Sequence, residues 1–390
     1  MSAVLAERVC SAGSAALPAA PTGRREDIDA CASEVLAMLQ NHSYEDTAAH
    51  FRTSRGKVYS LAVRAGARKN EAAILERKAD RRRRQLEFME SVVNSVQKAD
   101  VLDFLAGLPD DSVPLHLCSP PYNLGLSYGQ GASADAFSYS YYLGWSIQVL
   151  SEMARTLAPG GTLFYQVGST RGPDGGLVPI DTVLFQHLIT MGLTFKTRIA
   201  WVVPHGLTPK RRLAERYETA LVFTKGPEHR VFNPDPVRTP QRQPGKRAFR
   251  GPNKGQLSGN PFGAHPSNVW TIPNARHNAP GRVEGHPAQM PVELARRAIL
   301  LWTLPGDLVV DCFSGSGTTA EAAIRTGRAF SGCDLFYEDL RAQRLAAVSP
   351  DLSTPLPGIT DESLAVWQAE ARPVHVPARD PDLFDAPVPG

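Results

Sequence analysis

The stretch Asp311-Cys312-Phe313-Ser314-Gly315-Ser316-Gly317-Thr318 decides the fold of this 390-residue chain. It follows a short apolar segment, 308–311, and precedes a helical pattern over 320–326, so it predicts a strand, a glycine turn and a helix. Glycines at such a turn let the backbone approach a ligand closely, which is typical of nucleotide-cofactor sites. Asp334 ends the next predicted strand, 329–333, where an acid can bind ribose hydroxyls. Because the third glycine of the dinucleotide fingerprint and the Gly-Lys of a phosphate loop are missing, NAD and ATP are disfavoured.

A second motif, Ser119-Pro120-Pro121-Tyr122, follows another predicted strand, 113–117. On its own, a pair of prolines after a strand is usually an ordinary turn. Proline cannot donate a hydrogen bond, however, so this rigid loop leaves its carbonyls free as acceptors. The serine adds another oxygen and the tyrosine adds a flat ring face. Together these groups suit a planar aromatic amine, whose hydrogens are gripped while its ring stacks on Tyr122.

Around both motifs, strand and helix patterns alternate. Helices are predicted over 139–157, 181–192 and 292–302, and further strands over 162–167, 194–203 and 219–224. This alternation is typical of a mostly parallel sheet covered by helices, so an α/β fold is expected. Residues 227–280 have abundant Pro, Gly, Asn and Arg with little periodicity, and they predict a loop-rich insert.

The N-terminal part of the chain is different. Residues 1–23 are rich in Ala, Ser, Gly and Pro and are expected to be flexible. From 24 to 90 the patterns are helical, and Asp46–Phe51 followed by Ser54–Tyr59 resembles the core of the helix-turn-helix superfamily. The recognition helix would be Ser54–Arg64, with Val58 and Leu61 facing inward. A small helical bundle making intrachain or dimer contacts is the alternative.

The positive charge is concentrated in two islands. The formal net charge is only +3, yet residues 52–84 hold twelve Lys or Arg against three acids. Residues 236–283 hold eight Lys or Arg and no acid. Such islands suggest a polyanion partner, although solvated loops would look the same. The candidate nucleic-acid contacts are Arg55, Lys57, Arg64, Arg238, Arg242, Lys246, Arg247, Arg250 and Lys254.

The composition excludes several classes of protein. With 42% hydrophobic and 21% charged residues the chain has a globular balance. The clean apolar runs, such as Ala298–Leu304, are far shorter than the ~20 residues of a membrane span, and no secretory signal is visible. The five cysteines form no Cys-x-x-Cys pair or other metal pattern. We expect a reduced, cytoplasmic, nucleoid-associated protein that holds no metal and contacts no membrane.

Together, the two motifs resemble those of the amino-methylating DNA methyltransferases that use S-adenosylmethionine. Ser119–Tyr122 is similar to their [S/D/N]-P-P-[Y/F/W] motif, and Asp311–Thr319 to their D-x-F-x-G-S-G-T-T motif, with Cys312 where proline is usual. The resemblance covers 98–226 and 285–345 and includes Gly285-His286-Pro287-Ala288-Gln289. The family often has lysine where Met290 stands and glutamate where Asp334 stands. The order of the motifs is the permuted one, the beta class.

The resemblance implies a Rossmann-like sheet built from two separated segments. It also implies roles for particular residues. Catalysis would rest on Ser119, Pro120, Pro121 and Tyr122. The cofactor would be bound by Asp100, Cys118, Asp311, Phe313, Gly315, Gly317, Thr318, Asp334, His286 and Pro287.

The expected domains follow from the composition and from the two resemblances together. Residues 1–23 form a flexible N-terminus, 24–90 a helix-turn-helix-like region, 91–226 a catalytic segment, 227–284 a target-recognition insert, 285–350 a cofactor-binding segment and 351–390 a Pro-rich acidic tail. The partners would be double-stranded DNA and a cognate restriction endonuclease, with the enzyme a monomer or a homodimer.

The implied reaction is methyl transfer to the exocyclic N4 amine of a flipped cytosine. Serine at the first motif position is typical of the cytosine enzymes of the family, and a hydroxyl suits the ring acceptors of cytosine better than a carboxylate does. N6-adenine methylation is the alternative. A protein-glutamine methyltransferase is disfavoured by Ser119 and by the motif order. A DNA-binding regulator without catalysis would leave Asp311–Thr319 unexplained.

Overall fold

The structure is a computed structural model, and it describes residues 32–39, 47–48, 58, 61, 71–129, 135–204, 206, 209–243, 245–260, 262–275 and 282–350. The chain divides into two compact units, Met1–Arg81 and Arg82–Gly390. In the described residues, no helix combines the length and apolarity that crossing a bilayer requires.

The first unit has a small helical core. Helix α2 (Ala32–Leu39) contributes Val35 and Leu39, and the helical residues Ala48, Val58 and Leu61 are buried with them. Val58 and Leu61 are therefore buried, as the sequence predicted. Most of the expected recognition helix, including Arg55, Lys57 and Arg64, lies outside the described residues. Helix α5 (Glu71–Val92) follows and continues into the second unit.

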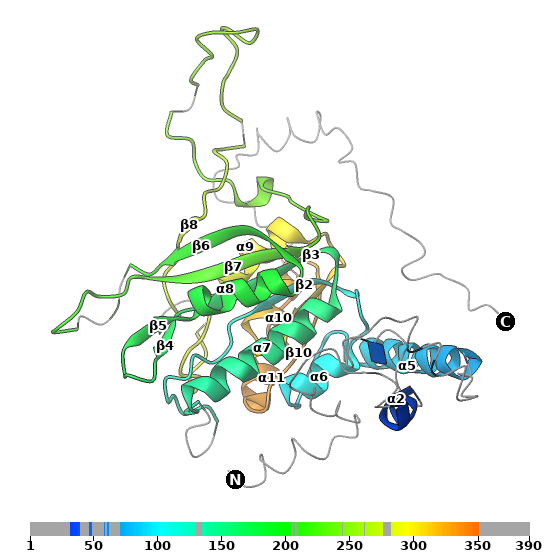
Figure 1. Cartoon of the computed structure of the whole chain (residues 1–390). Coiled ribbons are helices and arrows are strands. Elements are labelled where there is room, and N and C mark those ends of the chain that lie inside the picture. The colour runs from blue at the N-terminus through cyan, green and yellow to red at the C-terminus, as the bar shows by residue number, and fades with distance from the viewer. Residues whose placement is uncertain are drawn as a thin grey trace. The chain divides into compact units, whose positions relative to one another are not determined.

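The second unit is built on one eight-stranded sheet with the strand order β1-β10-β9-β2-β3-β7-β6-β8 (Figure 1). β7 is antiparallel to both of its neighbours, and every other neighbouring pair is parallel. The mostly parallel sheet expected from the sequence is thus confirmed. The strands are β1 (Ser95–Gln97), β2 (Val113–Cys118), β3 (Leu157–Val167), β6 (Leu193–Val202), β7 (Tyr217–Lys225), β8 (Val269–Thr271), β9 (Leu308–Asp311) and β10 (Ala329–Cys333). A separate hairpin pairs β4 (Ser169–Arg171) with β5 (Leu177–Pro179).

Helices cover the sheet on both faces, because alternate strand residues point to opposite sides. One core cluster joins the strands to α6 (Val101–Gly107), α7 (Tyr139–Thr156) and α8 (Ile180–Thr190). The other cluster joins them to α9 (Val292–Trp302) and α10 (Thr318–Arg325), and α11 (Glu338–Ala346) follows β10. The hydrophobic spacing of the sequence predicts α7, α8, α9 and α10, with ends shifted by at most a few residues.

The centre of the sheet joins two distant parts of the chain. β2 pairs with β9 in register, His116 opposite Val310, although almost two hundred residues separate them. This pairing places the loop after β2 beside the loop after β9. The two-segment sheet implied by the motif order is therefore confirmed.

Strand β3 starts earlier than the sequence suggests. The segment Pro159-Gly160-Gly161 is expected to separate a helix from a strand that begins at Thr162. Instead Leu157 already pairs with Val113, and the register then shifts so that Leu115 pairs with Thr162. Gly160 has φ 68°, which lets the extra residues bulge out of the ladder.

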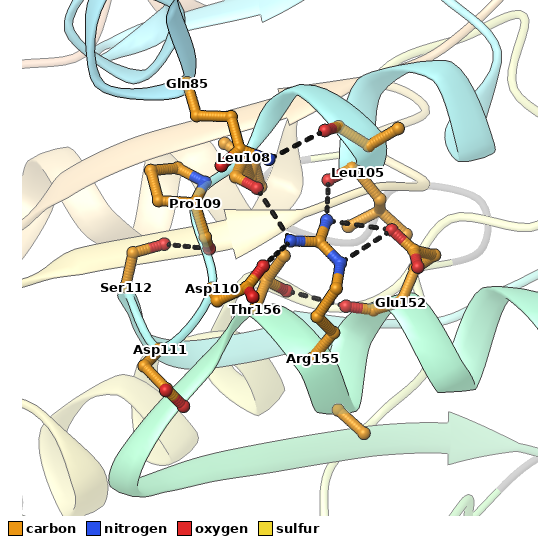
Figure 2. A network of polar contacts seen from close by, with 12 residues as sticks. Gln85, Leu105, Leu108, Pro109, Asp110, Asp111, Ser112, Glu152, Arg155 and Thr156 are labelled. Atoms are coloured by element: carbon orange, nitrogen blue, oxygen red, sulfur yellow. Dashed lines mark hydrogen bonds and ion pairs between the residues drawn. The ribbon is translucent and has the colours of Figure 1, made fainter. Parts of the chain in front are cut away.

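Arg155 fastens the opposite end of the sheet, near the start of β2 (Figure 2). Its guanidinium donates to the carbonyl oxygens of Leu105 (2.7 Å) and Leu108 (3.0 Å), which lie at the C-terminal end of α6. It also pairs with Glu152 (2.8 Å) and Asp110. A helix end leaves carbonyls without intrahelical partners, and Arg155 supplies a donor to that of Leu108. It adds a second donor to the Leu105 carbonyl, which already accepts from the Leu108 amide, and so joins α6 to α7.

We predict that Arg155→Ala lowers the free energy of unfolding by about 3 kcal/mol, because buried acceptors lose a charged donor. Urea denaturation would measure the loss. The control is Arg296→Ala, which removes an ion pair with Glu293 within one helix and should cost less than about 1 kcal/mol. Equal small losses in the two variants would show that Arg155 does not fasten this end of the sheet.

Candidate active site

The predicted cofactor and catalytic residues lie at one edge of the sheet, where four adjacent parallel strands end. Asp100 follows β1, Asp334 follows β10, the glycine turn follows β9, and Ser119 follows β2. In open α/β sheets the carboxyl ends of the strands form the crevice that binds ligands. Strand pairing has therefore brought together groups that are far apart in the sequence.

The glycine turn is organised around the carboxylate of Asp311. This side chain is buried, and it accepts hydrogen bonds from the amide of Phe313 (3.0 Å) and the hydroxyl of Thr319 (2.6 Å). Gly315 and Gly317 have φ values of 48° and 83°, in the left-handed region that favours glycine. Burial raises the pKa of Asp311 to about 7, although the hydrogen bonds from Thr319 and Phe313 act in the opposite direction.

A glycine that sequence reasoning missed is required at the same place. A Cβ atom on Gly332 of β10 would lie 2.1 Å from the carbonyl oxygen of Asp311 and 2.3 Å from the Ser314 hydroxyl oxygen. β9 and β10 can therefore approach each other at the turn only if this residue is glycine. A glycine inside a predicted strand was the available signal, since it often marks a close approach of two backbones.

Asp334 holds the turn from the neighbouring strand. One carboxylate oxygen accepts from the amide of Gly315 (2.8 Å) and the other from the amide of Phe336 (2.8 Å). Each carboxylate oxygen can accept more than one hydrogen bond, so further acceptor capacity remains for a ligand. Asp100 lies nearby: the amide of Asp334 donates to Gln97 of β1, and Asp100 caps α6 by accepting from Leu102 (2.8 Å).

Two buried arginines of α11 support the turn, and sequence reasoning missed both. Arg341 donates to the carbonyl oxygen of Gly315 (2.9 Å). Arg344 donates to the hydroxyls of Ser316 (2.8 Å) and Thr318 (3.0 Å) and pairs with Glu321 (2.7 Å). Because guanidinium groups offer several donors in a fixed plane, each of these side chains can hold several groups of the turn at once.

The remaining predicted cofactor residues are arranged as follows. The His286 ring lies over the turn, since a Cβ atom on Gly315 would be 2.6 Å from its Nε2 atom. Burial, with smaller effects from Arg344 and Arg341, lowers the pKa of His286 to about 4, so the ring is neutral near pH 7. Phe313 contacts Trp145 of α7, with ring centroids 5.7 Å apart.

Three further residues that the resemblance singles out lie in different environments, one exposed and two buried in the core. Pro287 is exposed. The Cys118 side chain is fully buried in the core beneath the site, together with Cys312 and Cys333. Met290, which stands where the family often has lysine, is buried in the second core cluster, which also contains residues of α9 and α10.

The Ser119–Tyr122 loop is held by a hydrogen-bond network around Glu218. The Tyr122 hydroxyl donates to the Glu218 carboxylate (2.9 Å) and lies 3.4 Å from the Ser119 hydroxyl. Gln166 of β3 donates to the same Glu218 oxygen. Burial and the Glu218 charge raise the pKa of Tyr122 well above its usual range, so the phenol remains protonated. On one side the ring packs so closely on Gly168 that a Cβ there would lie 2.9 Å from it.

The backbone on either side of Tyr122 is fixed as well. Tyr142 of α7 donates its hydroxyl hydrogen to the Pro121 carbonyl (3.0 Å). Asn123 has φ 57°, and the buried Asp135 carboxylate accepts from its amide (2.6 Å) and from that of Leu124 (3.0 Å). The motif is thus preorganised, with its ring and its acceptor atoms held in place before any ligand binds.

Part of the basic insert forms an arm that projects beyond the sheet (Figure 1). Its two sides are linked by the pairs Thr239–Ala264 and Arg247–Leu257. Arg238 lies at the base, half-buried and paired with Asp235 (2.6 Å). The other predicted contacts on the arm are exposed: Arg242, Lys246, Arg247, Arg250 and Lys254. They are therefore available to a large partner.

This chain is similar in sequence to known proteins. Residues 113–342 match the sequence model of the N6_N4_Mtase family, described as DNA methylase. The Type II methyltransferase M.BglII of Bacillus subtilis is 36% identical over 274 residues, which cover 70% of this chain and 74% of that protein. The DNA adenine methyltransferase YhdJ of Escherichia coli (strain K12) is 30% identical over 243 residues, covering 62% and 78%. Among solved structures, the cytosine-N4-specific PvuII DNA methyltransferase aligns with a TM-score of 0.48 and 20% identity, covering 67% of this chain and 95% of that one.

The raised pKa of Asp311 predicts a pH-dependent stability. The folded chain holds this proton more tightly than the unfolded chain, whose ordinary pKa is 3.8. The stabilisation from the protonated group is therefore full below that value and is lost as the pH rises toward about 7. Asp311→Asn cannot ionise, so its free energy of unfolding should fall less than that of the wild type between about pH 5 and about pH 8. Urea denaturation at both pH values measures the difference, with the exposed Asp103→Asn as control. Parallel pH curves for wild type and Asp311→Asn would contradict the prediction.

Proposed function

This chain belongs to the N6_N4_Mtase family of DNA methylases, and we propose that it methylates the N4 amine of cytosine in duplex DNA. The observation that carries the proposal is the position of Ser119–Tyr122. This acceptor-rich loop lies at the end of β2, directly beside the glycine turn at the end of β9. The methyl donor and the amine can thus meet at one edge of the sheet.

The methyl donor of such enzymes is S-adenosylmethionine, which supplies an electrophilic methyl group on a sulfonium. The residues at the edge fit this molecule. Gly315 and Gly317 have no side chain to obstruct the turn, and Asp334 keeps acceptor capacity for ribose hydroxyls. Asp100 would face the adenine end, and Phe313 and His286 would provide ring contacts. Thr318 and Asp311 hold the turn in shape and Pro287 would add a contact from its exposed position, while Cys118 forms part of the floor.

Ser119 and Pro120 would act on the amine. The lone pair of an exocyclic amine is delocalised into the base ring, so the nitrogen is a weak nucleophile. Hydrogen bonds accepted by the Ser119 hydroxyl and the Pro120 carbonyl draw the nitrogen toward tetrahedral geometry and direct its lone pair at the methyl carbon. Bound S-adenosylmethionine would supply the electrophilic methyl group, with its neutral thioether as the leaving group, and the proton of the alkylated nitrogen would pass to solvent.

Tyr122 would provide the surface on which the flipped base stacks. Its orientation does not depend on the base, because Glu218 fixes the hydroxyl and Gly168 supports the ring. Pro121 keeps the loop rigid and is itself held by Tyr142. The base would therefore enter a site whose geometry already exists.

The choice of cytosine rests on Ser119. A hydroxyl can donate to a ring acceptor of the base as well as accept from the amine, whereas a carboxylate next to the O2 and N3 acceptors of cytosine would be repelled. One of the relatives is named for the other base. YhdJ is named as an adenine methyltransferase, so N6-adenine is the second candidate.

DNA would be held by the two basic islands. The exposed arm cations would contact phosphates and base edges and so read sequence. Arg55, Lys57 and Arg64 in the N-terminal region would add affinity. A cognate restriction endonuclease would be the partner whose cleavage this methylation blocks, and the chromosome in the cytoplasm would be the place of action.

Transfer of a labelled methyl group from S-adenosylmethionine to duplex DNA tests the proposal. We predict that Ser119→Ala lowers the turnover rate by roughly 10- to 100-fold while leaving cofactor affinity, measured by calorimetry, nearly unchanged. The contact matters most as the nitrogen becomes tetrahedral, and Ser119 lies in the loop after β2 rather than in the glycine turn. The exposed Ser140→Ala on α7 is the matched control. A wild-type rate in Ser119→Ala would remove this residue from the mechanism, and a wild type that labels no DNA would overturn the proposed function.

A further inference from the structure

The loop that joins β6 to β7 leaves the sheet at the same edge as the candidate active site. β6 runs parallel to β3, because both are antiparallel to β7. Val202 at the end of β6 pairs with Tyr217 at the start of β7, and Thr219 pairs with Val167 at the end of β3. Glu218, which lies between those two positions of β7, is the residue that holds the Tyr122 hydroxyl at 2.9 Å. The loop therefore begins beside the proposed target-base site.

The two ends of this loop, where it meets β6 and β7, are fixed and its tip projects. The amide of Val203 donates to the carbonyl oxygen of Arg216 (2.8 Å), which joins the two ends. The Arg216 guanidinium lies against Gly206, where an added Cβ atom would be 2.5 Å from its Nη1 atom. The described residues 209–216 extend away from the ends of β6 and β7 (Figure 1). The tip is therefore carried on a defined support.

The tip presents one apolar side chain among cations. Leu213 is 90% exposed, the highest value among the large hydrophobic side chains of the described residues. Lys210, Arg211 and Arg212 precede it and are also exposed. The loop's one acid, Glu215, pairs with Arg212 (3.1 Å). This basic tip lies outside the two charge islands that the sequence indicated.

We propose that Leu213 enters the duplex beside the target base and fills the space that the base vacates when it flips. The inference rests on the proposed function. Proteins that distort duplex DNA insert apolar side chains between base steps, and an extruded base leaves an unstacked gap that an apolar group can occupy. The three neighbouring cations would hold the phosphates on either side of the gap.

The distances along the chain allow this arrangement. Leu213 lies five positions before Glu218 in the sequence. A fully extended chain of that length reaches at most roughly 17 Å. A major groove is about 12 Å wide, so Leu213 can lie within the duplex while the flipped base lies against Tyr122.

The arm carries another exposed apolar residue, Phe249, which is 81% exposed. Its position is different, because the arm starts at η1 (Asp235–Val237), whose buried Val237 belongs to the same core cluster as α9. Among the described residues, no backbone hydrogen bond joins arm positions 240–260 to the Ser119–Tyr122 loop. The arm is thus suited to flanking sequence, and the β6–β7 loop to the target position.

A pair of duplexes separates a flipping role from general binding. Both carry one mapped methylation site, and in the second an abasic nucleotide replaces the partner of the target base, so that flipping costs less. We expect Leu213→Ala to lower the single-turnover methylation rate about tenfold or more on the paired duplex and less than about threefold on the abasic one. Leu213→Met should stay near wild type on both, and Phe249→Ala should show no rescue by the abasic nucleotide.

Equal losses on the two duplexes, or no loss on either, would overturn the inference. Rescue of Phe249→Ala by the abasic nucleotide, with Leu213→Ala unaffected, would place the inserted residue on the arm and overturn it too. A wild type that methylates neither duplex would instead refute the proposed function, which makes the two failures distinguishable. Cofactor affinity, measured for each variant by calorimetry, should be unchanged.

Discussion

The glycine turn of the candidate active site is built around the buried carboxylate of Asp311. By accepting from Phe313 and Thr319 it bends the chain from β9 into the glycine turn, and its backbone carbonyl accepts from Ser314. That bend brings Gly315 to Asp334 on one side and to Arg341 on another. The turn can close only because Gly332 leaves room for it. A cofactor site of this kind is a backbone shape, and the surrounding side chains serve to hold that shape.

The second constraint is the pairing of β2 with β9. It brings the proposed catalytic loop from the first half of the chain to the proposed cofactor turn in the second half, and the same sheet adds Glu218 through β7. Because Glu218 and Gly168 fix Tyr122 independently of any ligand, the site is preorganised for a flat ring. The β6–β7 loop precedes β7 and the basic arm follows it, and each is suited to a different part of a duplex.

Much of this arrangement could be predicted from the sequence, and the part that could not has a common cause. β9, β10 and α9 were predicted with the bounds that the structure has, because short apolar runs and helical spacing are local signals. The roles of Glu218, Arg341, Arg344 and Gly332 were missed, because each depends on a contact between segments that only the sheet brings together.

The start of β3 at Leu157 was missed for a similar reason. Its pairing with Val113 continues the strand through a Pro-Gly-Gly segment that looks like a break when the sequence is considered alone. The resemblance to the permuted class of the family, in contrast, implied the two-segment sheet correctly, because that resemblance depends on which motif comes first along the chain.

The atom that receives the methyl group distinguishes direct transfer to an exocyclic amine from methylation of a ring carbon. DNA incubated with the protein and S-adenosylmethionine carrying a deuterated methyl can be digested to nucleosides and analysed by mass spectrometry. Direct transfer to the amine held by Ser119 and Pro120 predicts deuterated N4-methylcytosine. Deuterated N6-methyladenine would contradict the assignment of the base, and deuterated 5-methylcytosine would contradict direct transfer to an exocyclic nitrogen.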